Sequence, residues 1–174
     1  MKSLNKICLT IIAIGILIAF VGEFLLNFSQ NYQNLGNFLF ENGLRIGQLS
    51  GFFMLLQNGT FIFTKYFRWI KFIISFILIG TLIKILHWEF YADWILTIGM
   101  ASIILIYGIS FFKKPIKNLL DYLKLFWVIA NFALSIAVFL HLINRDLLQI
   151  SNYILWLAVI VFVKTKLDSK QLFL

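Results

Sequence analysis

The sequence predicts an all-α integral membrane protein, a bundle of six transmembrane helices arranged as three hairpins, with both termini cytoplasmic. Three observations support this prediction: the apolar composition, the length of the apolar runs and the distribution of basic residues. Hydrophobic residues make up 61% of the 174 residues and charged residues only 13%, whereas a soluble domain carries about 25% charged residues. A soluble fold of this size has too little interior for so much apolar surface. We therefore expect residues 1–174 to form a single polytopic membrane domain.

Six segments are candidates for membrane spans, each of which needs about 20 mostly apolar residues. Five are clear: Ile7–Asn27, Phe67–Leu86, Trp94–Phe112, Leu125–Ile143 and Leu147–Val163. The sixth, Leu44–Thr64, is less apolar because it contains Arg45 and several side-chain amides. The short connections between the segments predict antiparallel hairpins over residues 7–64, 67–112 and 125–163.

The basic residues decide whether Leu44–Thr64 spans, because positively charged loops stay on the cytoplasmic side. With six spans and an inner N-terminus, twelve of the 15 Lys and Arg residues fall inside, namely Lys2, Lys6, Lys65, Arg68, Lys71, Lys113, Lys114, Lys117, Lys124, Lys164, Lys166 and Lys170. Only Arg45, Lys84 and Arg145 fall in the outer part. Without the sixth span this bias is lost. The net charge of +8 is thus explained by topology and by contact with anionic lipid, and no nucleic-acid partner is expected.

Small residues at helical spacing predict where the helices pack, since lipid offers no hydrophobic force that drives helices together. In the second span Gly43, Gly47 and Gly51 recur every four residues, and the first span has Gly15 and Ala19 four apart. We expect these five residues to lie at helix–helix contacts.

Four ionisable residues, Glu23, Lys84, His87 and His141, lie near the ends of odd-numbered spans. Because these spans all run from inside to outside, the four residues are expected on the outer side. Glu23 and Lys84 would lie within about 6 Å of their helix ends, and each would reduce the cost of burying the other. The group is a candidate ion or partner site. The alternative is that these side chains only form structural pairs or extend to the interface.

Other functional classes have little support in the sequence. His87 and His141 could ligate a haem or a metal, but no ligand-spacing motif accompanies them, so no metal site and no cofactor is expected. The chain has no phosphate-binding glycine loop, HExxH, nucleophile elbow or CxxC, so we predict no catalytic residue and no enzyme. Cys8 is the single cysteine, which excludes an intramolecular disulfide. The first span begins like a signal peptide, but no good cleavage site follows it, so we expect it to be retained.

A short motif connects the third and fourth spans. Residues 80–88 read Gly-Thr-Leu-Ile-Lys-Ile-Leu-His-Trp, after a lysine-flanked apolar helix and before a helix that contains Gly99. This pattern resembles the G-x-L-[FI]-K-I-x-H-[WF] motif in the N-terminal hairpin of the gliding-motility protein GldL family, over residues 65–112. The resemblance implies the membrane part of a proton-driven motor that energises gliding and type IX secretion, with Lys84 and His87 at the positions of the family's lysine and histidine.

The family's membrane glutamate has no counterpart in this chain. It lies about one turn after the helix glycine, where this sequence has Ile103, and the span Trp94–Phe112 contains no acid. The resemblance therefore implies a GldL-like hairpin without the motor's proton-binding carboxylate.

From these observations we expect a small polytopic inner-membrane protein that is structural or accessory to a membrane complex. Its expected partners are the lipid bilayer and either other membrane proteins or further copies of itself. One alternative is a proton or ion conductor, or a small solute transporter, that uses Glu23, Lys84 and His87. Another is a membrane enzyme or haem protein, which a visible absorption spectrum would test.

Overall fold

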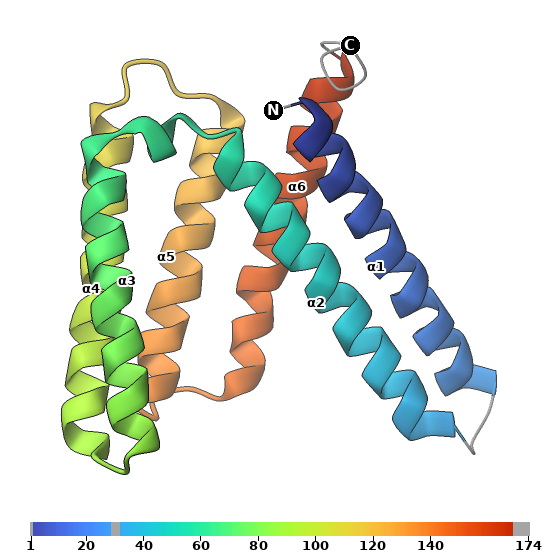
Figure 1. Ribbon diagram of the computed structural model, residues 1–174, viewed down its shortest axis with the longest axis horizontal. Coiled ribbons are helices and arrows are strands. Elements are labelled where there is room, and N and C mark those ends of the chain that lie inside the picture. The colour runs from blue at the N-terminus through green and yellow to red at the C-terminus, as the bar shows by residue number, and fades with distance from the viewer. Residues whose placement is uncertain (1, 29–31, 169–174) are drawn as a thin grey trace. The chain divides into compact units, whose positions relative to one another are not determined.

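The structure, a computed structural model, describes residues 2–28 and 32–168, and the regular secondary structure of this part of the chain is entirely helical (Figure 1). The α-helices are α1 (Lys2–Phe28), α2 (Gln33–Gln57), α3 (Lys65–Ile85), α4 (Glu89–Lys113), α5 (Leu119–Phe139) and α6 (Gln149–Asp168). Two 3₁₀ turns, η2 (Thr60–Phe63) and η3 (Arg145–Leu148), precede α3 and α6. The prediction of six long helices is confirmed. Lys170, one of the basic residues expected inside, lies outside the described residues.

The helices form two compact units. Unit 1 contains residues 1–59 and 159–174, and unit 2 contains residues 60–158. The α1–α2 hairpin thus belongs to unit 1 and α3, α4 and α5 belong to unit 2, whereas α6 contributes its first half to unit 2 and its second half to unit 1. Among the candidate site residues, Glu23 lies in unit 1, whereas Lys84, His87 and His141 lie in unit 2.

Five of the six helices are long and apolar enough to cross a membrane: α1, α3, α4, α5, and α6 together with η3. Their outward surfaces carry large apolar side chains, and Phe20, Leu78, Leu105, Phe126 and Ile160 are 60–71% exposed. Soluble monomers rarely expose a large continuous apolar surface, so these faces are suited to lipid. α2 does not meet the same criterion, since it carries charged and amide side chains. That the sixth segment crosses the membrane stays a prediction.

The boundaries of α2 differ from the predicted span, which covers residues 44–64. The helix begins earlier, at Gln33. Its first turns pack on α1 through Gly36, which lies against the backbone of Gly22. It also ends earlier, at Gln57, because Asn58 terminates it. The Asn58 side-chain amide donates to the Met54 carbonyl oxygen at 2.8 Å, and the backbone N–H of the same residue donates to that oxygen at 3.2 Å. A helix end is stabilised when its free carbonyl groups find such donors.

Small residues bring α1 and α2 into backbone contact. A Cβ atom added to Gly43 would lie 2.5 Å from the Ala19 backbone nitrogen and 2.6 Å from the Gly15 carbonyl oxygen. A Cβ atom added to Gly15 would lie 2.7 Å from the Gly43 carbonyl oxygen and 3.0 Å from the Gly47 nitrogen. These four residues are buried. Only residues without a larger side chain allow the two backbones to approach this closely.

Three further glycines of unit 1 make close approaches. A Cβ atom on Gly36 would lie 3.0 Å from the Gly22 carbonyl oxygen, and one on Gly22 would collide with the Phe40 backbone nitrogen. Gly51 is also buried, but its neighbour is a side chain: a Cβ atom there would lie 2.7 Å from a methyl group of Val159 in α6. The sequence pattern did not single out Gly22 and Gly36, which extend the α1–α2 contact toward the α1–α2 connection.

Polar contacts join the other end of the α1–α2 hairpin. The side-chain amides of Asn5 and Asn58 donate to each other's oxygen atoms, at 3.2 and 2.7 Å. The Ser50 hydroxyl donates to the Cys8 carbonyl oxygen at 2.9 Å. Asn5 and Ser50 are buried, and paired amides satisfy each other away from water. The two helices are therefore in contact along almost their full length.

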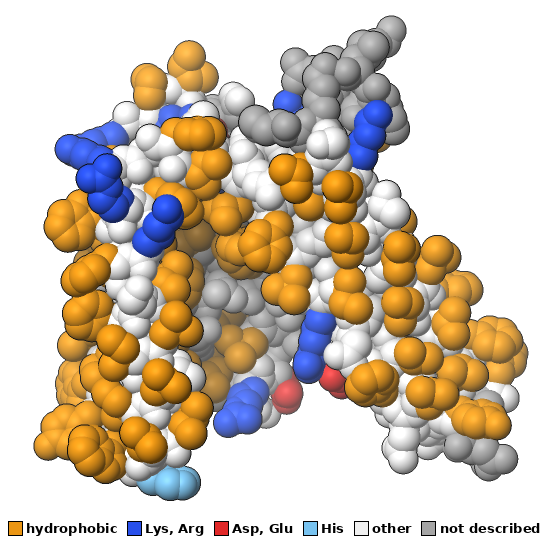
Figure 2. Space-filling view, in the orientation of Figure 1, with side chains coloured by type: hydrophobic (Ala, Val, Ile, Leu, Met, Phe, Trp, Pro, Cys, Tyr) orange, Lys and Arg blue, Asp and Glu red, His pale blue; other side chains and the backbone are white. Residues whose placement is uncertain are grey.

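In unit 2, α3, α4 and α5 pack around a small apolar core. Ile70, Ile103 and Val128, one from each helix, are 5–7% exposed and form its centre. Gly80 and Gly99 allow α3 and α4 to approach, since added Cβ atoms would lie 2.9 Å from Ile95 and 2.7 Å from Ile77 side-chain carbons, respectively. Figure 2 shows apolar side chains over the outside of these helices and basic side chains gathered where α3 begins.

Candidate functional site

Lys84 connects α3, α4 and α5 at one end of unit 2. It lies in the last turn of α3, and its ammonium nitrogen is 2.6 Å from an Asp93 carboxylate oxygen in α4. The same nitrogen lies 4.8 Å from the centre of the Phe139 ring, at the end of α5. Both charged side chains are about one-third exposed. A lysine here is also favoured by the partial negative charge at the C-terminus of α3. The ion pair and the cation–π contact therefore hold the ends of three helices together.

The sequence predicted Glu23 as the partner of Lys84, and the structure gives a different one. Among the described residues the carboxylate that pairs with Lys84 is Asp93. Glu23 is exposed on α1, and its side chain accepts a hydrogen bond from the Asn27 amide at 3.0 Å, one turn further along the same helix. Asp93 could have been found from the sequence, because a short turn between two antiparallel helices brings the end of the first close to the start of the second.

His87 and His141 both end helices. They have φ angles of 63° and 56° and are the two described residues other than glycine with positive φ. His87 donates its backbone N–H to the Lys84 carbonyl oxygen at 3.1 Å, and Trp88 donates to Ile83 at 3.3 Å. These two hydrogen bonds, together with the positive φ of His87, form the Schellman motif, which terminates helices.

The end of α5 repeats the same arrangement. His141 donates its backbone N–H to the Val138 carbonyl oxygen at 3.0 Å, and Leu142 donates to Ala137 at 2.8 Å. This motif explains why α5 ends at Phe139 and not at Ile143, as the sequence predicted. Glycine is the usual residue at this position, and histidine is among the few others that tolerate it. The similar placement of the two histidines in the sequence therefore has a local backbone cause.

A glycine at either position should be at least as stable as the histidine. We expect His87→Gly and His141→Gly to raise the free energy of unfolding by up to about 1 kcal/mol, because glycine adopts positive φ without strain. His87→Val should lower it by about 1 kcal/mol or more, because a β-branched residue is strongly disfavoured there. Thermal unfolding in detergent measures both changes. If the glycine variants lose as much stability as His87→Val, the imidazole ring, and not the backbone, is what these positions require.

An apolar layer separates the two polar ends of unit 2. One turn beyond Asp93, on the same side of α4, is the hydroxyl of Thr97, which is buried and has no hydrogen-bond partner among the described residues. From there the inward face of α4 continues with Met100 and Ile103, which are 8% and 5% exposed. The next titratable side chain on α4 is Tyr107, about 15 Å of helix beyond Thr97.

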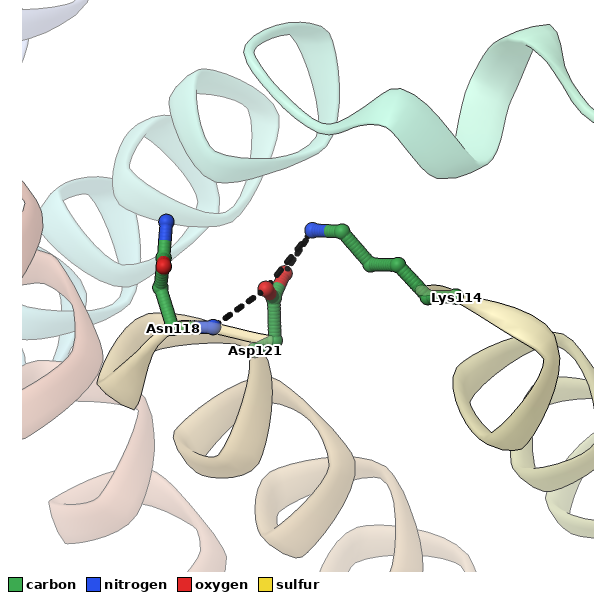
Figure 3. A network of polar contacts seen from close by, with 3 residues as sticks. All are labelled: Lys114, Asn118 and Asp121. Carbon is green, nitrogen blue, oxygen red and sulfur yellow. Dashed lines mark hydrogen bonds and ion pairs between the residues drawn. The ribbon is translucent and has the colours of Figure 1, made fainter. Parts of the chain in front are cut away.

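A second ion pair lies at the opposite end of unit 2, between α4 and α5 (Figure 3). The Lys114 ammonium nitrogen lies 2.7 and 2.6 Å from the two carboxylate oxygens of Asp121. The same carboxylate accepts the backbone N–H of Asn118 at 3.0 Å. An acid in the first turn that bonds the preceding cap residue is half of a capping box. This contact explains why α5 begins at Leu119, earlier than the predicted span.

The described residues contain no group of three or more His, Cys, Asp or Glu residues that could hold a metal ion. His87 and His141 are both exposed, and each already has a backbone role. Among polar contacts that the sequence pattern missed, the most buried is that of Ser151 in α6, whose hydroxyl donates to the Asn131 side-chain oxygen in α5 at 3.3 Å.

The residues of the motif thus have identifiable structural roles. Gly80 allows close packing on α4, Lys84 pairs across the hairpin, and His87 with Trp88 ends α3. No curated protein and no solved structure matches the chain. Residues 70–131 match the family model described as the GldL N-terminal domain, a range that begins in α3 and ends in α5. This match extends further along the chain than the predicted range of 65–112. Together with the five apolar helices it supports a multi-pass membrane protein, and residues 70–131 are a GldL-like segment of it.

Proposed function

We propose that this protein is a multi-pass inner-membrane protein of the gliding-motility type, with a structural or accessory role in a membrane complex. The match to the GldL N-terminal domain supports the family relation of residues 70–131. The roles of Lys84 and His87 in closing the α3–α4 hairpin support a structural function for the ionisable residues of the motif. The proposed partners are the lipid bilayer and other membrane proteins, including further copies of this chain.

The observation that carries the proposal is the apolar layer of unit 2. Ile70, Ile103 and Val128 meet between the Lys84–Asp93 pair at one end and the Lys114–Asp121 pair at the other. A proton relay needs titratable or water-binding groups across the membrane, and the packed face of α4 is apolar at this level. A carboxylate at position 103 would be needed to bridge it, and the chain has isoleucine there.

We further propose that all six helices cross the membrane and that both termini are cytoplasmic. α2 contacts α1 from the Asn5–Asn58 pair to the close approach of Gly22 and Gly36. Asn5 and Gly22 are separated by about 25 Å of helix, most of the hydrocarbon thickness of about 30 Å. A helix that follows α1 over this distance crosses where α1 crosses. The basic residues where α3 begins would then lie on the cytoplasmic side.

Proton flux into proteoliposomes under an imposed membrane potential tests the proposed function. We expect wild-type protein to give no flux above that of protein-free liposomes, and Glu23→Gln and Asp93→Asn to behave identically. Lys84→Met should leave the flux unchanged but lower the thermal stability, because it leaves the Asp93 carboxylate without its partner. Native mass spectrometry of the mildly solubilised protein would then identify the complex in which it acts.

A proton or ion conductor is the second candidate function. The Lys84–Asp93 pair, which is about one-third exposed, is followed along α4 by the buried Thr97 hydroxyl, which has no hydrogen-bond partner among the described residues. These groups favour conduction, because they form the beginning of a polar path along α4. A wild-type flux that Asp93→Asn abolishes would establish this alternative and overturn the accessory role.

A further inference from the structure

α2 carries a polar stripe along one face. The stripe consists of Asn34, Asn37, Glu41, Arg45 and Gln48, which follow one another at intervals of three or four residues. Such spacing places side chains on one side of a helix. Gln48 is half-buried and the other four residues are exposed. Near the middle of α2, Glu41 and Arg45 form an ion pair of 3.1 Å, and their side chains are 64% and 68% exposed.

The polar stripe faces away from α1. Residues two apart on a helix differ in direction by about 200°. Asn34, Glu41 and Arg45 each precede by two positions a glycine that packs on α1, namely Gly36, Gly43 and Gly47. Gln48 has the same relation to Ser50, whose hydroxyl bonds to α1. The side of α2 that meets α1 is therefore small and buried, and the opposite side is polar.

A polar stripe at this depth requires a polar neighbour. The proposed crossing of the membrane by α2, on which this inference rests, places Glu41 and Arg45 near the bilayer centre. Charged side chains in hydrocarbon are costly, and they face other helices or water instead of lipid. The internal ion pair lowers this cost without removing it, and the amides of Asn37 and Gln48 lie on the same side of α2.

We propose that a second copy of this chain, inserted in the same orientation, covers the polar stripe by two-fold pairing of α2 with α2. In a parallel two-fold pair each residue lies near its own counterpart. The side-chain amides of Asn34, Asn37 and Gln48 both donate and accept hydrogen bonds, so each is complementary to itself. Glu41 lies one turn from Arg45, so each can pair with the opposite charge of the partner helix as well as with its own.

The pairing provides a partner for every polar side chain of the stripe. Two glutamates and two arginines would form a neutral four-charge cluster at the centre, and amide pairs would lie on either side of it. Interhelical hydrogen bonds of this kind stabilise the association of helices in membranes. Polar residues at such an interface also fix the register and the number of helices.

Disulfide cross-linking in membranes tests the pairing directly. In a Cys8→Ala background, Asn37→Cys should form a covalent dimer on mild oxidation several-fold more than Leu35→Cys. Leu35 is the matched control, because it is 47% exposed, lies at nearly the same depth and points to a different side of α2. Equal cross-linking at the two positions, or a cross-link to another protein in place of the dimer, would overturn the proposal.

Charge exchange between differently tagged chains provides a second test. Glu41→Arg chains and Arg45→Glu chains should each be monomeric alone, because like charges would meet in a homodimer. When the two are co-expressed they should co-purify as a mixed dimer, since opposite charges then meet. Pairing within one chain cannot produce this rescue. Absence of a mixed dimer, together with a monomeric wild type in nanodiscs, would contradict the proposed pairing.

The crossing of α2 needs its own measurement, so that its failure is distinguishable from failure of the dimer. Gln33→Cys and Gln57→Cys, at the two ends of α2, should react with a membrane-impermeant maleimide from opposite sides. If both react from the same side, the crossing itself is wrong. If they react from opposite sides and no dimer forms, only the two-fold pairing is excluded.

Discussion

Gly43→Ala is expected to separate α1 from α2, with a loss of about 3 kcal/mol in the free energy of unfolding. The added methyl group would lie 2.5 Å from the backbone nitrogen of Ala19 and 2.6 Å from the carbonyl oxygen of Gly15. Both neighbours are backbone atoms, so no side chain can rotate to make room and the helices themselves must move apart. Elsewhere in a helix a glycine-to-alanine substitution usually increases stability, because alanine favours a helix over glycine by about 1 kcal/mol. At Gly43 we expect the opposite effect.

Cys8 provides a direct readout of this separation. It is the only cysteine of the chain, it is 7% exposed, and its carbonyl oxygen accepts the hydrogen bond from Ser50 of α2. We expect a maleimide to label Cys8 slowly in the wild type and faster in Gly43→Ala. A circular dichroism melt in detergent would give the accompanying loss of stability.

Gly108→Ala is the matched control for Gly43→Ala. Gly108 lies inside α4, five residues before its last residue, and nothing lies within 4 Å of a Cβ atom added there. This variant should leave the labelling of Cys8 unchanged and raise stability by up to about 1 kcal/mol. If Gly43→Ala instead behaves like Gly108→Ala, the α1–α2 backbone contact does not exist in the membrane.

The small-residue contact could be proposed from the sequence because glycine spacing directly reflects a helix face. Gly15, Gly43 and Gly47 were identified from their intervals of four residues, and they lie in mutual contact. The start of α2 was not predicted, for an equally physical reason. Hydropathy averages over all sides of a helix, and the polar stripe lowered the average of a segment whose other side packs closely on α1.

The candidate site was harder to predict because the relevant feature is in the backbone. Histidine suggests a ligand or a proton carrier by its chemistry, and the sequence contains no direct sign that His87 and His141 have positive φ. The ion pair of Lys84 was missed for a different reason. Glu23 was chosen as the partner because it lies at a depth in the membrane similar to that of Lys84. In the structure the hairpin turn instead brings an Asp93 carboxylate oxygen to 2.6 Å from the Lys84 ammonium nitrogen. Side chains that face each other across a turn depend on where each helix ends.

Ile103→Glu, which places a carboxylate where the GldL family has one, is expected to destabilise unit 2 strongly. Ile103 is 5% exposed and meets Ile70 of α3 and Val128 of α5. Aliphatic and aromatic side chains pack around these three, so a carboxylate would be placed among apolar groups. Burial of an unpaired charge in such a place costs about 3 kcal/mol or more. We expect a large fall in the yield of folded protein and in the thermal unfolding temperature.

Two further substitutions at the same position separate charge from shape. Ile103→Leu keeps the volume and should cost less than about 1.5 kcal/mol. Ile103→Gln matches the size and polarity of the glutamate without its charge, so the difference between the two variants reports the charge alone. Acidification should recover part of the stability of Ile103→Glu, because a protonated carboxyl group is neutral, and it should not change Ile103→Gln.

The outcome at Ile103 also bears on function, because the same apolar layer carries the argument against conduction. If Ile103→Glu is as stable as Ile103→Leu at neutral pH, a cation or water must reach the middle of α4. The Lys84–Asp93 pair and the Thr97 hydroxyl would then belong to a continuous polar path, and the conductor alternative would gain support. If Ile103→Glu is destabilised as expected, Ile103 stabilises the GldL-like segment at the position where the GldL family has its carboxylate. That result would support the proposed accessory role, because the packing of unit 2 would then exclude a carboxylate at this level.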